Sequence, residues 1–290
     1  MKTQIRPDFT GTGGQLFGQL FVGYLLCILT VGIYIPWFIV RLSRYFYDKT
    51  TLKSGTGVSA RLQFTGTGAD LFVTGLVGYL LTLATFGIYG AWFTANVIKF
   101  FTDNSKAIGD DGSQYQLRFD GTGGELFITF FLGYLVTICT FGLYTPWFMC
   151  RLQKVILSRT SIVKDGEDLG RFDFVGNGGV LFGTFIIGYF LTAFTLGLYL
   201  PWFKVSMLKF FAQNTQAHID GQIYACDFLG TGGELFAIQL VGIILTVLTL
   251  GIYMFWYMAN LLKFQTNHIM FAPTGEGTMS NLPRAIVRYG

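Results

Sequence analysis

The chain has 290 residues, of which 52% are hydrophobic and only 12% are charged. Ordinary soluble domains carry about 25% charged residues, so this composition cannot cover a water-facing surface in the usual way. The net charge of +4 is too small, and its basic residues are too dispersed, to indicate a nucleic-acid binder.

Five neutral stretches run through the chain and leave the charged residues in the segments between them. Each stretch is 25 to 32 residues long and has no Asp, Glu, Lys or Arg, whereas a bilayer crossing needs about 20 apolar residues. We therefore predict that all five insert into a membrane. They cover residues 9–40, 71–98, 126–150, 174–203 and 235–262.

The chain repeats one unit five times. All five tryptophans recur at steps of 55, 55, 55 and 54 residues, and glycines and tyrosines keep the same step. Self-similarity at a fixed period is the signature of a repeat architecture. We divide the chain into repeats 1–50, 51–105, 106–160, 161–215 and 216–271, called units 1 to 5, and a C-terminal tail, 272–290.

Each unit starts with short segments that resemble strands. Polar and apolar residues alternate over 61–64 and 116–119, and turn residues precede them, as at 109–112. This pattern predicts β-hairpin linkers with one apolar face.

A glycine-rich sequence, G-T-G-G, follows the strand at 11–14, 121–124 and 230–233, with variants at the other two positions. It lacks the Lys and Ser/Thr of a phosphate-binding P-loop. The favoured interpretation is a strand-to-helix joint with a capping threonine, and the alternative is a lipid phosphate held at the helix N-terminus.

The neutral stretch then predicts a helical hairpin in the membrane. About 18 apolar residues from Gly14 give a first helix of about 27 Å. Its central glycine, Gly23 in unit 1, favours close helix packing over a hinge. A turn at 30–37 ends the first helix, and Pro36 favours the start of a second one.

Tyrosine and tryptophan mark this turn in every unit, and both residue types prefer the membrane–water boundary. The predicted interface aromatics are Tyr34, Trp37, Tyr89, Trp92, Tyr144, Trp147, Tyr199, Trp202, Tyr253 and Trp256.

A basic residue stands seven positions after each tryptophan. We interpret these five residues, called the repeated cations, as anchors among lipid head groups, with a ring of positive charge that lines a pore as the alternative. The repeated cations are Arg44, Lys99, Lys154, Lys209 and Lys263.

The linkers resemble one another, which requires an even number of crossings per unit, and they hold most of the basic residues. The positive-inside rule then predicts a multi-pass protein of the bacterial inner membrane with both termini in the cytoplasm. The chain ends with two half-hairpins, 5–9 and 268–271. Their pairing within one chain would close a ring, and pairing between chains would build an oligomer.

The predicted fold class is therefore a mainly α integral membrane protein with five tandem repeats of about 55 residues. Each repeat combines a β-hairpin with a membrane helical hairpin, and a closed pseudo-five-fold ring is one arrangement that the terminal half-hairpins allow.

The repeated core resembles a known family. The segment 196–205, Leu-Gly-Leu-Tyr-Leu-Pro-Trp-Phe-Lys-Val, the cluster 209–211, the pair 214–215 and Phe228 are similar to the YjgN-like family of bacterial inner-membrane proteins. The resemblance covers nearly the whole chain. It implies a membrane location and no chemistry, because the family has no assigned function.

The residues themselves do not indicate an enzyme, a metal site or a cofactor. The two histidines, His218 and His268, lie in linkers, and the four cysteines show no C-x-x-C pairing. We predict a structural or scaffolding membrane module that forms homo-oligomers, binds anionic lipids and has no nucleic-acid partner. The alternative is a passive pore or transporter lined by the second helices.

Overall fold

The strands of all five units form one closed sheet. The computed structural model describes residues 4–55 and 59–274, and within these ranges ten antiparallel strands close into a barrel in which chain neighbours pair. The strands are β1 (Ile5–Phe9), β2 (Thr50–Ser54), β3 (Ser59–Phe64), β4 (Ser105–Gly109), β5 (Gln114–Phe119), β6 (Thr160–Lys164), β7 (Glu167–Phe174), β8 (Thr215–Ile219), β9 (Gln222–Phe228) and β10 (Ile269–Pro273).

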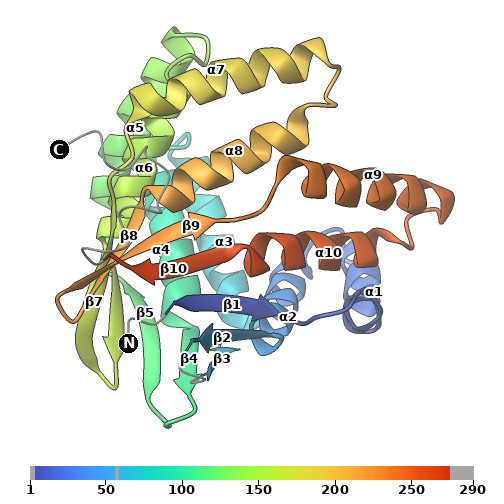
Figure 1. The fold of residues 1–290 in the computed structure, drawn as a ribbon, viewed down its shortest axis with the longest axis horizontal. Coiled ribbons are helices and arrows are strands. Elements are labelled where there is room, and N and C mark those ends of the chain that lie inside the picture. The colour runs from blue at the N-terminus through green and yellow to red at the C-terminus, as the bar shows by residue number, and fades with distance from the viewer. Residues whose placement is uncertain (1–3, 56–58, 275–290) are drawn as a thin grey trace.

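A helical hairpin joins the strands at one end of the barrel, once in each unit. The first helix has 17 residues and the second has 14. In Figure 1 the hairpins α7–α8 and α9–α10 project away from the strands, with their turns at the far ends. The first helices are α1 (Gly13–Leu29), α3 (Gly68–Ala84), α5 (Gly123–Cys139), α7 (Gly178–Phe194) and α9 (Gly232–Leu248), and the second are α2 (Ile35–Asp48), α4 (Gly90–Asp103), α6 (Thr145–Ser158), α8 (Leu200–Gln213) and α10 (Met254–Asn267).

The two ends of the chain close the barrel. Ile5 lies opposite Phe271, and the backbone N–H of Phe9 donates to Asn267 Oδ1 at 2.7 Å. Asn267 Nδ2 also donates to Asp8 Oδ1 at 3.3 Å. The predicted pairing of the terminal strands is confirmed, and it occurs within one chain. Of the predicted tail, 272–290, the part from residue 275 lies outside the described residues.

The predicted mainly α fold class is wrong, because a closed antiparallel barrel organises the molecule. Alternation in the linkers predicts individual hairpins correctly. It does not show that the last strand of one hairpin pairs with the first strand of the next. Since every unit presents the same two strands, this pairing repeats until β10 meets β1.

The prediction of membrane-spanning helices is also wrong. As predicted, each neutral stretch holds most of a first helix, a turn and the start of a second helix, and the error concerns the crossing, because the first helix has only 17 residues. Seventeen residues extend about 25 Å, and the bilayer core is about 30 Å thick. Among the described residues, no helix combines the length and the apolar character that a crossing needs.

A buried phenylalanine at the end of one strand in each unit joins the barrel to the helices. Phe9 stacks on Phe46 of α2 with ring centroids 5.5 Å apart and meets Tyr45 edge-on at 6.1 Å. The Tyr45 hydroxyl donates to Thr12 O at 3.0 Å and so fixes α2 against the start of α1. The equivalents of Phe9, each at most 4% exposed, are Phe64, Phe119, Phe174 and Phe228.

The glycine-rich joint is a helix cap and a packing contact. Thr12, Thr67, Thr122 and Thr231 each accept the N–H of the third helical residue, so the predicted capping threonine is confirmed. The glycine after each cap lies against the tryptophan of the preceding unit. At Gly178 a Cβ would stand 2.7 Å from Trp147 Cα, which leaves no room for a side chain.

This contact shows how the hairpins are arranged. Each tryptophan lies in the first turn of a second helix, close to the hairpin turn, yet it touches the first turn of the next unit's first helix. Every hairpin therefore leans over the base of the next one. Each helix packs against its neighbours in chain order, and α10 packs against α1, so the helices form a second closed ring.

The central glycines pack the two helices of each hairpin, as predicted. A Cβ on Gly23 would lie 3.0 Å from the Phe38 ring, and an aromatic ring of the second helix occupies the same place in every unit. The other pairs are Gly78 with Phe93, Gly133 with Phe148, Gly188 with Phe203 and Gly242 with Tyr257.

Candidate functional site

The turn of each hairpin has one rigid geometry. In unit 1 the Thr30 hydroxyl donates to Leu26 O at 2.7 Å and accepts from the Tyr34 N–H at 3.0 Å. The Gly32 N–H donates to Cys27 O at 2.8 Å. These bonds hold Val31 and Gly32 in the left-handed region, at φ +50 and +89. Gly32 adopts this conformation freely, whereas Val31 does so at a steric cost.

Among the described residues of each unit, the residue held in this costly conformation is the most exposed apolar one. Its φ lies between +49 and +51 in all five turns. We call these five residues the tip residues: Val31 (93% exposed), Phe86 (98%), Phe141 (98%), Leu196 (95%) and Leu250 (95%). Strained backbone and a large exposed apolar side chain both concentrate at functional sites.

The apolar surface continues from the tip residues along the first helix. In unit 1 the residues Phe21, Val22, Leu25, Ile28 and Leu29 are all exposed. Phe21 lies ten residues before Val31, which is about 15 Å along a helix. In unit 1 this is half of the roughly 30 Å bilayer core, and in unit 2 the exposed apolar zone continues to Val73, thirteen residues or about 20 Å before Phe86.

The sequence interpretation missed the tip residues. It assigned the turn to an interface through its tyrosine and tryptophan and gave no role to the residue before the glycine. The signal was present, because that residue is a large apolar one in every unit: Val-Gly, Phe-Gly, Phe-Gly, Leu-Gly and Leu-Gly.

The predicted interface aromatics lie one turn behind the tips, in the joints between hairpins. Tyr34 and Trp37 stack with centroids 5.9 Å apart, and Trp37 also contacts Phe72 of the next unit at 5.2 Å. The same tyrosine–tryptophan stack occurs in the other four units. These side chains therefore hold neighbouring hairpins together, whatever solvent surrounds them.

The repeated cations lie further from the tips, at the tenth residue of each second helix. Nine residues separate Lys263 from the start of α10, which is about 13 Å along the helix. Arg44, Lys99, Lys154 and Lys263 are exposed, and Lys209 is half-buried. Arg44 donates to the carbonyl of Gly66 in the next unit at 2.7 Å.

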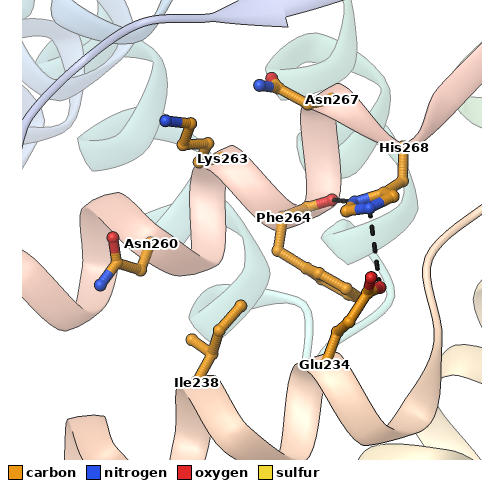
Figure 2. Close-up of a pocket in the computed structure, with 7 residues that line it drawn as sticks. All are labelled: Glu234, Ile238, Asn260, Lys263, Phe264, Asn267 and His268. Atoms are coloured by element: carbon orange, nitrogen blue, oxygen red, sulfur yellow. Dashed lines mark hydrogen bonds and ion pairs between the residues drawn. The ribbon is translucent and has the colours of Figure 1, made fainter.

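Carboxylates stand in the first turn of three first helices: Asp70, Glu125 and Glu234. Glu125 forms an ion pair with Arg159, and Glu234 lies 3.7 Å from His268 Nε2 (Figure 2). The Thr231 N–H bond to Glu234 lowers the pKa of this carboxyl below its usual range, with smaller contributions from His268 and Lys209. Glu234 therefore stays ionised near neutral pH.

Three threonines within the first helices bond to their own helix, whereas the buried Thr192 hydroxyl has no hydrogen-bond partner among the described residues. Thr82, Thr137 and Thr246 donate to the carbonyl four residues earlier, at 2.6 Å in each case.

Burial raises the pKa of the Cys226 thiol to about 12, with Asp227 adding to the shift, so this cysteine is unreactive near neutral pH. Within the described residues, His, Cys, Asp and Glu form no cluster that could hold a metal ion.

Asp103, at the end of α4, has a buried carboxylate oxygen, and its replacement measures the free-energy cost of this burial. Its Oδ1 is buried and, within the described ranges, has no hydrogen-bond partner, and burial raises the pKa of the carboxyl. Asn267 occupies the equivalent position in unit 5 and accepts the Phe9 N–H. We expect Asp103→Asn to increase the free energy of unfolding by about 1 kcal/mol at pH 7.

This gain should depend on pH. A raised pKa means that protonation favours the folded state, so the wild-type chain regains stability as the pH falls through the pKa of Asp103, and the advantage of the variant disappears. Chemical denaturation in detergent at several pH values measures it. The control is Asp48→Asn at the exposed equivalent in unit 1, where no gain is expected.

Profile comparison decides the family. Residues 4–56, 59–111 and 223–272, together more than half of the chain, match the family described as "Bacterial protein of unknown function (DUF898)". The chain belongs to this family. Residues 116–218 of this DUF898 protein match a second profile, described as "Family of unknown function (DUF6693)". The predicted resemblance to YjgN-like proteins, in repeated form, is confirmed.

A curated relative of this DUF898 protein is "Inner membrane protein YjgN" of Salmonella typhimurium (strain LT2). The two are 32% identical over 80 residues, which is 28% of this chain. The match covers 19% of the relative, so the chain spans about a fifth of that protein's length. No solved structure matches the chain.

Proposed function

We propose that this chain is a bacterial inner-membrane protein that inserts its five hairpin tips into one leaflet and serves as a structural, non-enzymatic module. The observation that carries the proposal is the set of five tip residues, which are fully exposed and held in a strained turn. The printed name of the Salmonella relative supports the inner-membrane location.

The tips supply enough free energy for stable attachment. Burial of one large apolar side chain contributes about 1.5–3 kcal/mol, and the hairpins add further exposed apolar residues behind each tip. Five tips on one closed ring act together, so their contributions combine. A single myristoyl chain, in comparison, gives only marginal and reversible binding.

The repeated cations fit the same placement. Each lies at most about 13 Å along its helix from the apolar turn, which is close to the half-thickness of the bilayer core. With the tips in the leaflet, the cations reach the head groups and bind anionic lipid. A juxtamembrane lysine or arginine contributes about 1 kcal/mol near an anionic surface.

Lys99→Gln is therefore expected to weaken binding to vesicles that contain anionic lipid by roughly fivefold, and to leave binding to neutral vesicles unchanged. Vesicle flotation at two salt concentrations measures both. Lys106→Gln, on strand β4 of the same unit, is the matched control. An equal loss in the two variants would contradict a role for the repeated cations.

The tryptophans test the depth directly. All five lie in the first turn of a second helix and touch the base of the next hairpin, so intrinsic fluorescence reports the depth of the contacts between neighbouring hairpins. We expect strong quenching by lipids brominated along the acyl chains and weak quenching by acrylamide once vesicles are present. Equal acrylamide quenching with and without vesicles would exclude insertion.

Two further outcomes bear on the module's role. Release of an anionic dye trapped in the vesicles would favour the passive-pore alternative over the structural one.

Assembly of several copies is part of the proposal. The mass of detergent-extracted particles gives the number of copies in each particle. A monomer at all protein concentrations would contradict the proposed homo-oligomer.

A further inference from the structure

One face of the barrel sheet carries an apolar residue on every strand. Residues that lie opposite each other in an antiparallel sheet point to the same side, so the strand pairing traces this face around the barrel. Leu52 pairs with Pro7 on one side and with Ala60 on the other. The trace passes through all ten strands and returns through Phe271 to Ile5. We call it the apolar face, and its larger residues include Leu52, Leu62, Leu117, Ile162, Phe172 and Phe271.

The opposite face of the same strands is charged and polar. Arg6 pairs there with Lys53. Arg171 pairs with His218. These four side chains are exposed, whereas the six larger residues of the apolar face are all half-buried. Because the concave side of a closed barrel is the more enclosed one, the apolar face lines the interior.

This interior has no packed core of its own among the described residues. Each cluster of buried apolar residues lies at the junction of two neighbouring units, as Phe9 of unit 1 lies with Phe255 of unit 5. None of these clusters joins units on opposite sides of the ring. Side chains that filled the interior would be buried against several units at once. The half-buried apolar face therefore borders open space.

The number of strands sets the width of this space. Eight strands leave an interior that side chains just fill or that holds one small ligand, and the diameter grows roughly linearly with strand number. Ten strands are about a quarter wider. The apolar face also contains small residues, Ala60, Ala107 and Ala217, so large side chains do not take up the added width.

We infer that the barrel interior binds a single linear hydrocarbon chain, the acyl chain of a membrane lipid. The apolar face surrounds such a chain with van der Waals contacts, and each methylene group that leaves water adds to the affinity. Within the described strands, charged residues appear on this face only beside a strand turn, as at Lys164. The middle of the interior therefore has no charge that would favour a polar ligand.

The leaflet is the source of this chain. The helical hairpins stand at one end of the barrel, and the strand turns lie at the other (Figure 1). With the tips in the leaflet, the helical end of the barrel faces the acyl chains. This source rests on the proposed function, whereas the lining of the interior does not.

Leu62→Trp tests whether the interior is open. In a filled interior the larger side chain would overpack the core and lower the melting temperature, whereas in an open interior it fits and takes the place of the ligand. We expect an unchanged melting temperature and at least about tenfold less retained lipid. Native mass spectrometry of protein extracted from membranes measures the lipid.

Gln63→Trp is the matched control. Gln63 is the next residue of β3, is exposed and points to the opposite face, so this variant should keep the lipid. A melting temperature lowered in Leu62→Trp but not in Gln63→Trp would show a filled interior and overturn the inference. Equal lipid content in the wild-type chain and both variants would overturn it as well.

Photoactivatable probes locate the chain in the wild-type protein and separate its sources. Vesicles with a photoactivatable phosphatidylcholine should label Leu62 or Leu117 on the apolar face. Labelling of these residues by free photoactivatable palmitic acid, in a protein that binds no vesicles, supports the interior site, and in that case only the proposed insertion fails. Labelling confined to the hairpins with both probes overturns the inference.

Discussion

Replacing Gly178 with alanine is expected to lower the free energy of unfolding by about 2 kcal/mol. The added Cβ would stand 2.6 Å from Trp147 Cδ1 and 2.7 Å from Trp147 Cα. The Cα atom belongs to the backbone of α6, and the indole is held between Tyr144 and Phe182 at 6.0 and 5.0 Å. Since neither can move freely, the cost is that of an overpacked core, about 1–3 kcal/mol.

Gly183→Ala is the matched control for this variant. Gly183 lies in the same helix, α7, and no atom lies within 4 Å of the Cβ that the substitution adds. Alanine favours the helix over glycine, so a gain of about 0.5–1 kcal/mol is expected. Thermal and chemical unfolding in detergent compare the two variants. Equal effects would show that the contact between hairpins does not stabilise the ring.

The contact between Gly178 and Trp147 also shows the limit of the sequence. Both residue types recur with the repeat, so their importance was predictable, and so were the hairpin linkers and the capping threonines. Their contact was not predictable, because it joins the first turn of one helix to the first turn of another in the next unit. The period of the sequence repeat shows which residues are equivalent. It does not show how far each hairpin leans over the next one.

The helices were misread for a related reason. The neutral residues predict the hairpin and a first helix of about 18 residues, close to the 17 observed, but a length of about 27 Å does not establish that this helix crosses a bilayer. The turn residues, Thr30 and Gly32, were recognised as a break. The packing of the two helices through Gly23 and Phe38 agrees with the predicted role of the central glycine, whereas both helices extend less than a bilayer core.

The largest effect on membrane binding is expected from the tips. The double variant Phe86→Asp, Phe141→Asp should weaken binding to neutral vesicles by more than about a thousandfold. Each change removes about 1.5–3 kcal/mol of apolar burial and adds the cost of a charge among acyl chains, about 2.5–3.5 kcal/mol at the centre of the bilayer. A factor of a thousand corresponds to only about 4 kcal/mol, so even a partly inserted tip would show the loss.

The double variant should fold as stably as the wild-type chain, so a loss of vesicle binding can be assigned to lost insertion and not to unfolding. Both phenylalanines are 98% exposed, so their side chains contribute little packing, and aspartate tolerates the left-handed conformation at φ +49 better than phenylalanine does. The melting temperature in detergent should therefore stay the same or rise. The control variant, Val175→Asp with Leu229→Asp, places the same charges on exposed apolar residues at the base of the hairpins. If the control weakens vesicle binding as much as the tip variant, the membrane meets the barrel end of the molecule and not the hairpin turns.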